Sequence, residues 1–223
     1  YLKNVYFITG TAYAGKSTTV KMLSEKYDMI FCGENYHSVV SNVVANPENQ
    51  PEISYLNNLT DFRDFVTRSP EEYARWIFAT SKEAAEFEIA ELLSISKDKK
   101  VIVDTNIPID ILKEISDYNH VAVMISPLSM SVERFFDRND PEKLFILNTI
   151  ESCENPAERL HLCLWLRLCH LLHRLHLYYL LLWHRLWHPS CGLQLGQWHV
   201  DFERERCYLV IFFLTETRNL HEP

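Results

Sequence analysis

Two glycines, a lysine and a serine near the N-terminus have a spacing that could bind phosphate. Gly10 is followed by four residues and then by "GKS", which completes the GxxxxGK[ST] pattern. Glycines permit a tight turn whose backbone N–H groups face phosphate oxygens, the lysine can reach the β- and γ-phosphates, and the serine hydroxyl can bind Mg²⁺. The segment follows an apolar run and precedes a helical one, so we predict that it binds ATP and Mg²⁺. The expected nucleotide contacts are Gly10, Thr11, Ala12, Tyr13, Ala14, Gly15, Lys16, Ser17 and Thr18.

Two carboxylates follow other apolar runs. Asp104 ends the run in "VIVDTN", and the carboxyl end of a parallel strand faces the ligand crevice. There it could hold Mg²⁺ together with Ser17, or it could cap the next helix. Glu34, in "MIFCGENYH", could orient a substrate hydroxyl or accept its proton, and a solvated loop glutamate is the alternative.

Arg134 and Arg138 lie four residues apart in "SVERFFDRNDPEK", and hence on one helical face. This helix would follow the fourth strand and could form a lid around residues 128–160. Its guanidinium groups would then stabilise charge on a transferring phosphoryl group. The alternative is a surface helix whose arginines pair with neighbouring acids.

Weaker signals come from two further sets of residues. Arg63 and Arg68 could bind a substrate anion, but a solvated position is the preferred interpretation. The cysteines and histidines between 163 and 176 are irregularly spaced for zinc, so a metal site is not expected there.

Strand-like and helix-like segments alternate through the first 158 residues. Ser69 and Pro70 mark the start of a long helix, and Asn106 is expected to cap a shorter one. This alternation predicts an α/β fold with a parallel sheet covered on both faces. The expected strands are 5–9, 29–33, 99–105, 120–126 and 207–214, and the expected helices are 15–27, 69–96 and 108–116.

Residues 159–200 differ sharply in composition from the rest. They contain no lysine, aspartate or glutamate, and they hold seven of the ten histidines. Arginines and histidines interrupt the leucine-rich run, so a transmembrane helix is not expected. The segment has the composition of out-of-frame or misassigned sequence, and we treat the whole chain, 1–223, as a single domain.

Charge and cysteine content restrict the possible partners. The formal net charge of −8 over 223 residues does not favour nucleic acid or an anionic membrane surface. Six scattered cysteines and no recognisable signal peptide indicate a cytoplasmic protein with reduced thiols. The oligomeric state is left open.

The segments "YFITGTAYAGKST", "CGENYHS", "VIVDTNIP" and "DRNDPEK" together resemble P-loop small-molecule kinases of the nucleoside-monophosphate and shikimate kinase type. More closely, the chain resembles a group of bacterial cytoplasmic P-loop proteins described as ATPases or kinases. The likeness covers residues 3–158 and, faintly, 207–220. It implies a three-layer P-loop NTPase fold with a five-stranded parallel sheet of order 2-3-1-4-5 and a mobile lid after the fourth strand. It also implies that Glu34 contacts the acceptor.

These features lead to the hypothesis of an ATP- and Mg²⁺-dependent phosphotransferase acting on a small hydroxyl- or phosphate-bearing molecule. Lys16, Glu34, Asp104, Arg134 and Arg138 are the expected catalytic residues. Two alternatives stay open. One is a P-loop ATPase or nucleotide switch that acts on a protein partner, and the other is a nucleotide-binding module without turnover.

Overall fold

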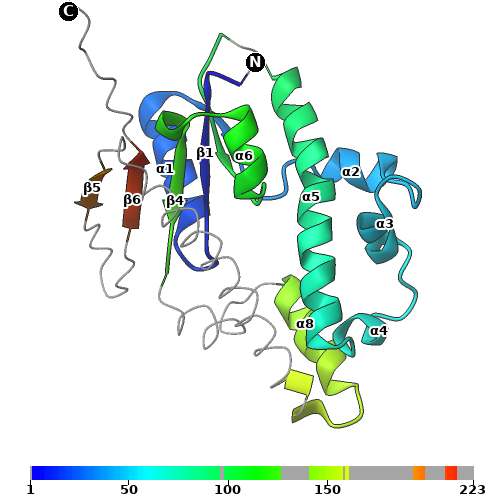
Figure 1. Cartoon of the computed structure of the whole chain (residues 1–223). Helices are drawn as coiled ribbons and strands as arrows, with labels where there is room; N and C mark the ends of the chain where they lie inside the picture. The colour runs from blue at the N-terminus through cyan, green and yellow to red at the C-terminus, as the bar shows by residue number, and fades with distance from the viewer. Residues whose placement is uncertain are drawn as a thin grey trace, which may run out of the picture.

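Four parallel strands form the central sheet, in the order β2-β3-β1-β4 (Figure 1). Both the parallel pairing and the neighbours of these four strands match the prediction. The computed structural model describes residues 2–95, 98–126, 141–157, 159–160, 193–198 and 209–214. The strands are β1 (Val5–Gly10), β2 (Ile30–Cys32), β3 (Val101–Asp104) and β4 (Val121–Met124).

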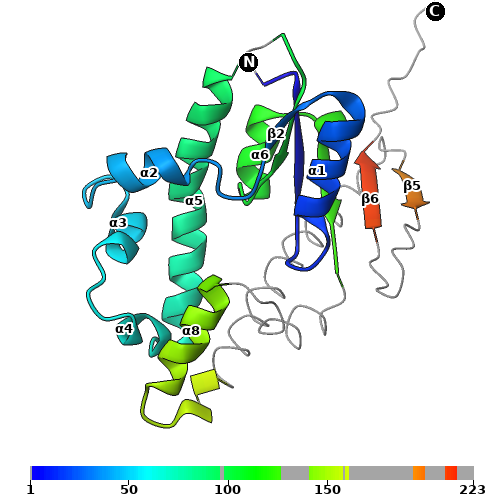
Figure 2. The same cartoon turned by 180° about the vertical axis from the view of Figure 1, so that it is seen from behind.

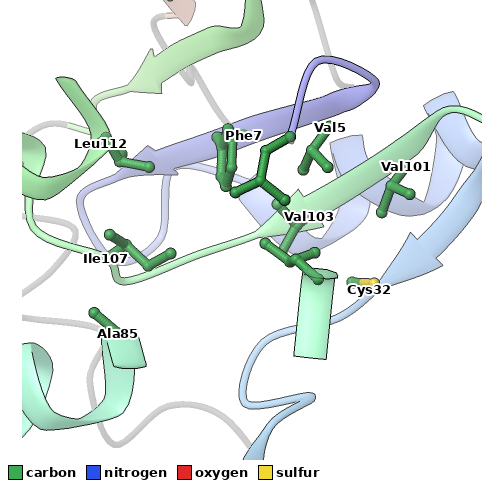
Figure 3. Packing of buried hydrophobic residues seen from close by; sticks show 10 residues of the cluster. Val5, Phe7, Cys32, Ala85, Val101, Val103, Ile107 and Leu112 are labelled. Carbon is green, nitrogen blue, oxygen red and sulfur yellow. The ribbon is translucent and has the colours of Figure 1, made fainter. Parts of the chain in front are cut away.

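Alternating side chains of β1 and β3 fill a separate core on each face of the sheet. On one face, Phe7 and Val103 pack with Ala85 from helix α5 (Pro70–Ser94), as Figure 3 shows. On the other face, Ile8 packs with Val20 from helix α1 (Lys16–Tyr27). Helices therefore cover both faces, as a buried parallel sheet requires.

The predicted long helix is α5, and its N-terminus is capped as expected. The backbone N–H of Glu72 donates to the Ser69 hydroxyl, and the Glu72 carboxylate accepts from the Ser69 N–H, which completes a capping box. The shorter helix α6 (Ile109–Ile115) begins later than the Asn106 cap predicts, with Pro108 at the N-cap position. The prediction of an Asn106 cap is therefore wrong, because the Asn106 amide is directed to Glu34 instead.

Three short helices connect β2 to α5, and the sequence analysis did not predict them. They lie alongside α5 (Figure 2). The Glu83 carboxylate on α5 accepts hydrogen bonds from the N–H groups of Glu52 and Ile53, at the start of the second of these helices. The start of this helix is stabilised by a side chain about 30 residues later in the chain, so hydrophobic periodicity alone did not reveal it. The helices are α2 (Ser38–Val44), α3 (Pro51–Asn57) and α4 (Arg63–Val66).

The C-terminal part contributes helix α8 (Pro141–Glu151) and an antiparallel pair, β5 (Leu193–Trp198) and β6 (Leu209–Leu214). β6 lies within the expected strand 207–214, but it pairs with β5 in a separate sheet and lies beside β4. A fifth parallel strand therefore stays a prediction. β5 falls within 159–200, where no strand was expected. No helix in the described ranges is long and apolar enough to cross a membrane.

Candidate functional site

The loop from Gly10 to Ser17 leaves the carboxyl end of β1 in a conformation that needs glycine. Gly10 has φ +137°, and a Cβ atom there would lie 1.8 Å from the carbonyl oxygen of Met124 on β4. The next residue, Thr11, donates its backbone N–H to the same carbonyl at 2.9 Å. Gly15 also has a positive φ, of 79°, immediately before α1. The backbone therefore requires glycine at position 10 and favours it at position 15.

A buried hydroxyl pair fixes this loop to the segment after β4. The Ser126 N–H donates to the Thr11 hydroxyl at 2.8 Å, and the two hydroxyl oxygens lie 3.0 Å apart. The Ser126 hydroxyl donates to the Ala12 carbonyl at 2.7 Å. The sequence analysis assigned no role to Ser126, although it ends a predicted strand. Its contacts hold the loop backbone from a second strand.

The N-terminus of α1 is directed at the same loop. The helix begins at Lys16, and its N-cap residue, Gly15, provides no side-chain cap. The first amides of an α-helix have no carbonyl partner within the helix, and they carry the positive end of its dipole. This arrangement is well suited to an anionic group.

Lys16, Ser17 and Asp104 come together at this position. The Ser17 hydroxyl donates to Asp104 Oδ2 at 2.6 Å, while Lys16 Nζ lies 4.0 Å from Asp104 Oδ1 and donates to the Thr11 carbonyl at 3.4 Å. Asp104 is 1% exposed. Burial raises its pKa above the usual value, whereas the Lys16 charge and the Ser17 hydrogen bond lower it. The predicted cluster is therefore assembled in the structure.

One oxygen of this cluster has no hydrogen-bond partner. Asp104 Oδ1 is buried and accepts no hydrogen bond from any described group. Lys16 Nζ lies 4.0 Å from this oxygen, so its charge is partly offset, but that distance is too long for a hydrogen bond. The orphaned oxygen, with the Ser17 hydroxyl on the other side of the same carboxylate, is a suitable donor set for a hard cation.

Glu34 lies exposed at the same edge of the sheet. Its Oε1 accepts a hydrogen bond from the Asn106 side-chain amide at 3.3 Å. Asn106 follows Asp104 by two residues, so the segments after β2 and β3 are cross-linked there. The structure therefore brings Glu34 to the edge of the sheet that carries Asp104, as predicted.

A second buried acid lies at this edge, and the sequence analysis did not single it out. Glu88, on α5, is 3% exposed, and its Oε2 accepts a hydrogen bond from the Thr105 hydroxyl at 2.6 Å. Its backbone carbonyl accepts from the Tyr36 hydroxyl at 2.9 Å. A glutamate within a helix usually lies in solvent, so only its position on the apolar face of α5 could have indicated burial.

Burial alters the protonation of this second cluster. Burial raises the pKa of Glu88 to about 7, although the hydrogen bond from Thr105 lowers it. His37 Nδ1 lies 4.0 Å from Glu88 Oε1, and it is buried without a hydrogen-bond partner. Burial lowers the pKa of His37, so the ring is neutral near pH 7. The two side chains therefore face each other without forming a stable ion pair.

Only two of the candidate arginines, Arg63 and Arg68, fall in the described part of the chain. Arg134 and Arg138 lie outside the described residues, with the rest of 128–140, whereas the later part of the expected lid contains α8. Arg63 hydrogen-bonds to Asp61 at an exposed position, and the Arg68 guanidinium lies 4.1 Å from the centre of the Tyr55 ring. The solvated position preferred for Arg63 agrees with its exposure, whereas Arg68 is half-buried.

Comparison of the chain with protein-family models, with curated proteins and with solved structures found no match. In the ranges that the structure describes, no group of three or more histidine, cysteine, aspartate or glutamate side chains could hold a metal ion. The candidate cation position at Asp104 has a single carboxylate and a hydroxyl. The assignment of this position as a cation site therefore depends on the local geometry alone.

Proposed function

We propose that the protein is an ATP- and Mg²⁺-dependent phosphotransferase with a P-loop at Gly10–Ser17. The observation that carries this proposal is the contact of Ser17 with Asp104 at 2.6 Å, beside the Lys16 amine at the N-terminus of α1. Positive backbone ends, a buried lysine and a buried carboxylate converge where a triphosphate and its metal would bind. A fifth parallel strand and the complete P-loop NTPase fold belong to the same proposal.

Each group has a distinct task in this scheme. The loop amides and Lys16 would bind the phosphate oxygens of ATP, and Lys16 would offset the charge that develops during transfer. The residues that would hold Mg²⁺ are Ser17 and Asp104, and the orphaned Asp104 Oδ1 supports this assignment. When bound, Mg²⁺ neutralises phosphate charge and orients the transferring group. Arg134 and Arg138 remain the proposed lid residues.

Glu34 would orient the acceptor from the opposite side of the same edge. Its carboxylate is exposed and is steadied by the Asn106 amide, so it is accessible to a hydroxyl group. Glu34 and Asp104 both raise the pKa of the neighbouring Glu88, which indicates mutual repulsion among these carboxyl groups. A further anion would increase that repulsion. We therefore favour an uncharged, hydroxyl-bearing acceptor over a phosphate-bearing one.

Release of ADP from ATP, measured with and without Mg²⁺ against a panel of nucleosides, nucleotides and small hydroxylated metabolites, tests the proposal. We expect one class of uncharged hydroxyl compounds to stimulate release. Lys16→Ala should reduce that release by about 100-fold or more, because the lysine acts on the reacting phosphates. Lys99→Ala is the matched control, since Lys99 forms an exposed ion pair with Asp28.

The remaining outcomes separate the alternatives. Steady ADP release without any acceptor would favour an ATPase acting on a protein partner. Tight ATP binding with no release under any acceptor would favour a binding module. Equal activity of Lys16→Ala and Lys99→Ala would contradict the role assigned to the loop.

A further inference from the structure

Glu88 contacts both loops that carry the proposed site residues. The first is the acceptor loop, residues 33–37, which holds Glu34 and reaches Glu88 through the Tyr36 hydroxyl on its backbone carbonyl. The second is the post-β3 loop, residues 104–107, which begins with Asp104 and reaches the Glu88 carboxylate through the Thr105 hydroxyl. α5 thereby contacts two loops that are far apart in the sequence, one after β2 and the other after β3.

The post-β3 loop depends on this contact for its own conformation. The Thr105 hydroxyl that donates to Glu88 also accepts the backbone N–H of Ile107 at 3.0 Å. The next residue, Asn106, donates its side-chain amide to Glu34 at 3.3 Å, and its backbone N–H is directed to the Glu88 carboxylate. The Glu88 carboxylate thus holds the loop whose Asn106 side chain makes the cross-link to Glu34.

We infer that Glu88 is a positioning residue, whose carboxylate fixes Glu34 relative to Asp104 by holding the post-β3 loop and, with it, the Asn106 amide that binds Glu34. The inference rests on the proposed phosphotransferase function. The Glu88 carboxylate is buried, so it acts through Thr105 and Asn106 rather than on the substrate. The Tyr36 hydroxyl binds the backbone carbonyl, which any residue at this position provides. A shift of either loop by about 1 Å is enough to cost a large factor in transfer.

The charge of Glu88 gives this role a pH dependence. The titratable groups that face it are His37 and Glu34 from the acceptor loop, Asp104 from β3, and the Tyr36 hydroxyl. Two donors, the Thr105 hydroxyl and the Asn106 N–H, are directed to its carboxylate, and both are best satisfied by the ionised form. Acceptor-dependent kcat/KM should therefore rise as the pH increases through about 7, the pKa of Glu88.

Three variants test the inference. Glu88→Ala removes the acceptor for the Thr105 and Asn106 donors, so it should raise the KM for the acceptor about tenfold or more and speed amide exchange in residues 105–107. The dissociation constant for Mg²⁺–ATP should stay within about twofold, because Asp104 is held by its place in β3 and by Ser17. Glu88→Gln keeps an acceptor oxygen, so it should restore slow exchange but abolish the pH inflection. Glu86→Ala, at an exposed position on α5, should change nothing.

Each result decides one question. Unchanged exchange in residues 105–107 of Glu88→Ala, or an unaltered pH profile in Glu88→Gln, would overturn the positioning role. If Glu88→Ala does not fold, the pH profile of Glu88→Gln still decides. If the wild-type protein binds Mg²⁺–ATP but turns over no acceptor, the proposed function fails, and the exchange measurement alone supports or overturns the positioning role.

Discussion

Two buried acids stand at the same edge of the sheet, and each has a basic side chain 4.0 Å away. Asp104 faces Lys16, and Glu88 faces His37. Burial raises the pKa of both acids, but the Lys16 charge opposes the shift of Asp104. Glu88 has no such charge beside it, because burial lowers the pKa of His37. The two base–acid distances are equal, so the kind of base, rather than its distance, makes the two electrostatic environments different.

The two acids also differ in how their surroundings are built. Asp104 is contacted by a continuous loop and the first turn of α1, whose conformation is fixed by glycines and by contact with β4. Glu88 is surrounded by side chains from three separate segments, the acceptor loop, α5 and the post-β3 loop. The first region should therefore be sensitive to backbone changes, and the second to charge.

The largest effect is expected from Gly10→Ala. The new Cβ would meet the Met124 carbonyl oxygen at 1.8 Å in a backbone conformation that disfavours side chains. We expect a loss of about 4 kcal/mol or more in the free energy of unfolding, together with loss of ATP binding. Urea unfolding and titration with a fluorescent ATP analogue measure the two quantities.

Two other glycines provide a graded control for this change. Gly15 has φ +79°, but a Cβ there would make only an ordinary contact of 3.9 Å with the end of the Met124 side chain, so Gly15→Ala should cost about 1 kcal/mol. Gly33→Ala meets only the flexible Phe31 ring and should cost less than about 1 kcal/mol. Equal effects at all three positions would show that the contact with β4 does not set the loop.

A smaller, pH-dependent effect is expected from Glu88→Gln. The pKa of Glu88 rises from 4.5 to about 7 on folding, so the folded state binds the proton more tightly, and stability falls as the pH increases through that window. Over the full window this amounts to roughly 3 kcal/mol. Glu88→Gln should therefore gain stability relative to the wild type by about that amount between pH 4.5 and pH 8.

His37 changes stability with pH in the opposite direction to Glu88. The difference in the free energy of unfolding between the wild type and Glu88→Gln is therefore more informative than the pH dependence of either protein. Because burial lowers its pKa, the folded state resists protonation, and stability falls as the pH drops below the ordinary histidine value of 6.5. This contribution is common to the wild type and Glu88→Gln. A pH-independent difference between the two, like that expected for the exposed Glu86→Gln, would contradict the raised pKa of Glu88.

The smallest effect is expected from Asp104→Asn. An amide keeps the hydrogen bond from Ser17 but removes the negative charge, so the Mg²⁺ concentration needed for half-maximal ATP binding should rise about tenfold. Asp28→Asn is the matched control, because Asp28 is exposed and forms an ion pair with Lys99 at the surface. An unchanged Mg²⁺ titration would assign Asp104 a structural role, like the role inferred for Glu88.

The sequence by itself determined the parts of the protein that depend on neighbouring residues. The spacing of Gly10, Gly15 and Lys16 specifies a loop, because glycine adopts the positive φ found at both ends of that loop without steric cost. Apolar runs and helical spacing located the four parallel strands and the long helix α5, together with its Ser69 cap. These features are encoded within a few turns of chain, so a single sequence reveals them.

The tertiary structure alone decided which distant side chains share an environment. Periodicity places Glu88 on the apolar face of α5 with Ala85 and Leu92, but only packing shows that its carboxylate is buried and binds Thr105, whereas Glu86 is left exposed. Asn106 was expected to cap a helix, but the fold gives its amide to Glu34, 72 residues earlier in the chain. Burial and long-range hydrogen bonds are properties of the assembled core, and these set the pKa values and the geometry of the proposed site.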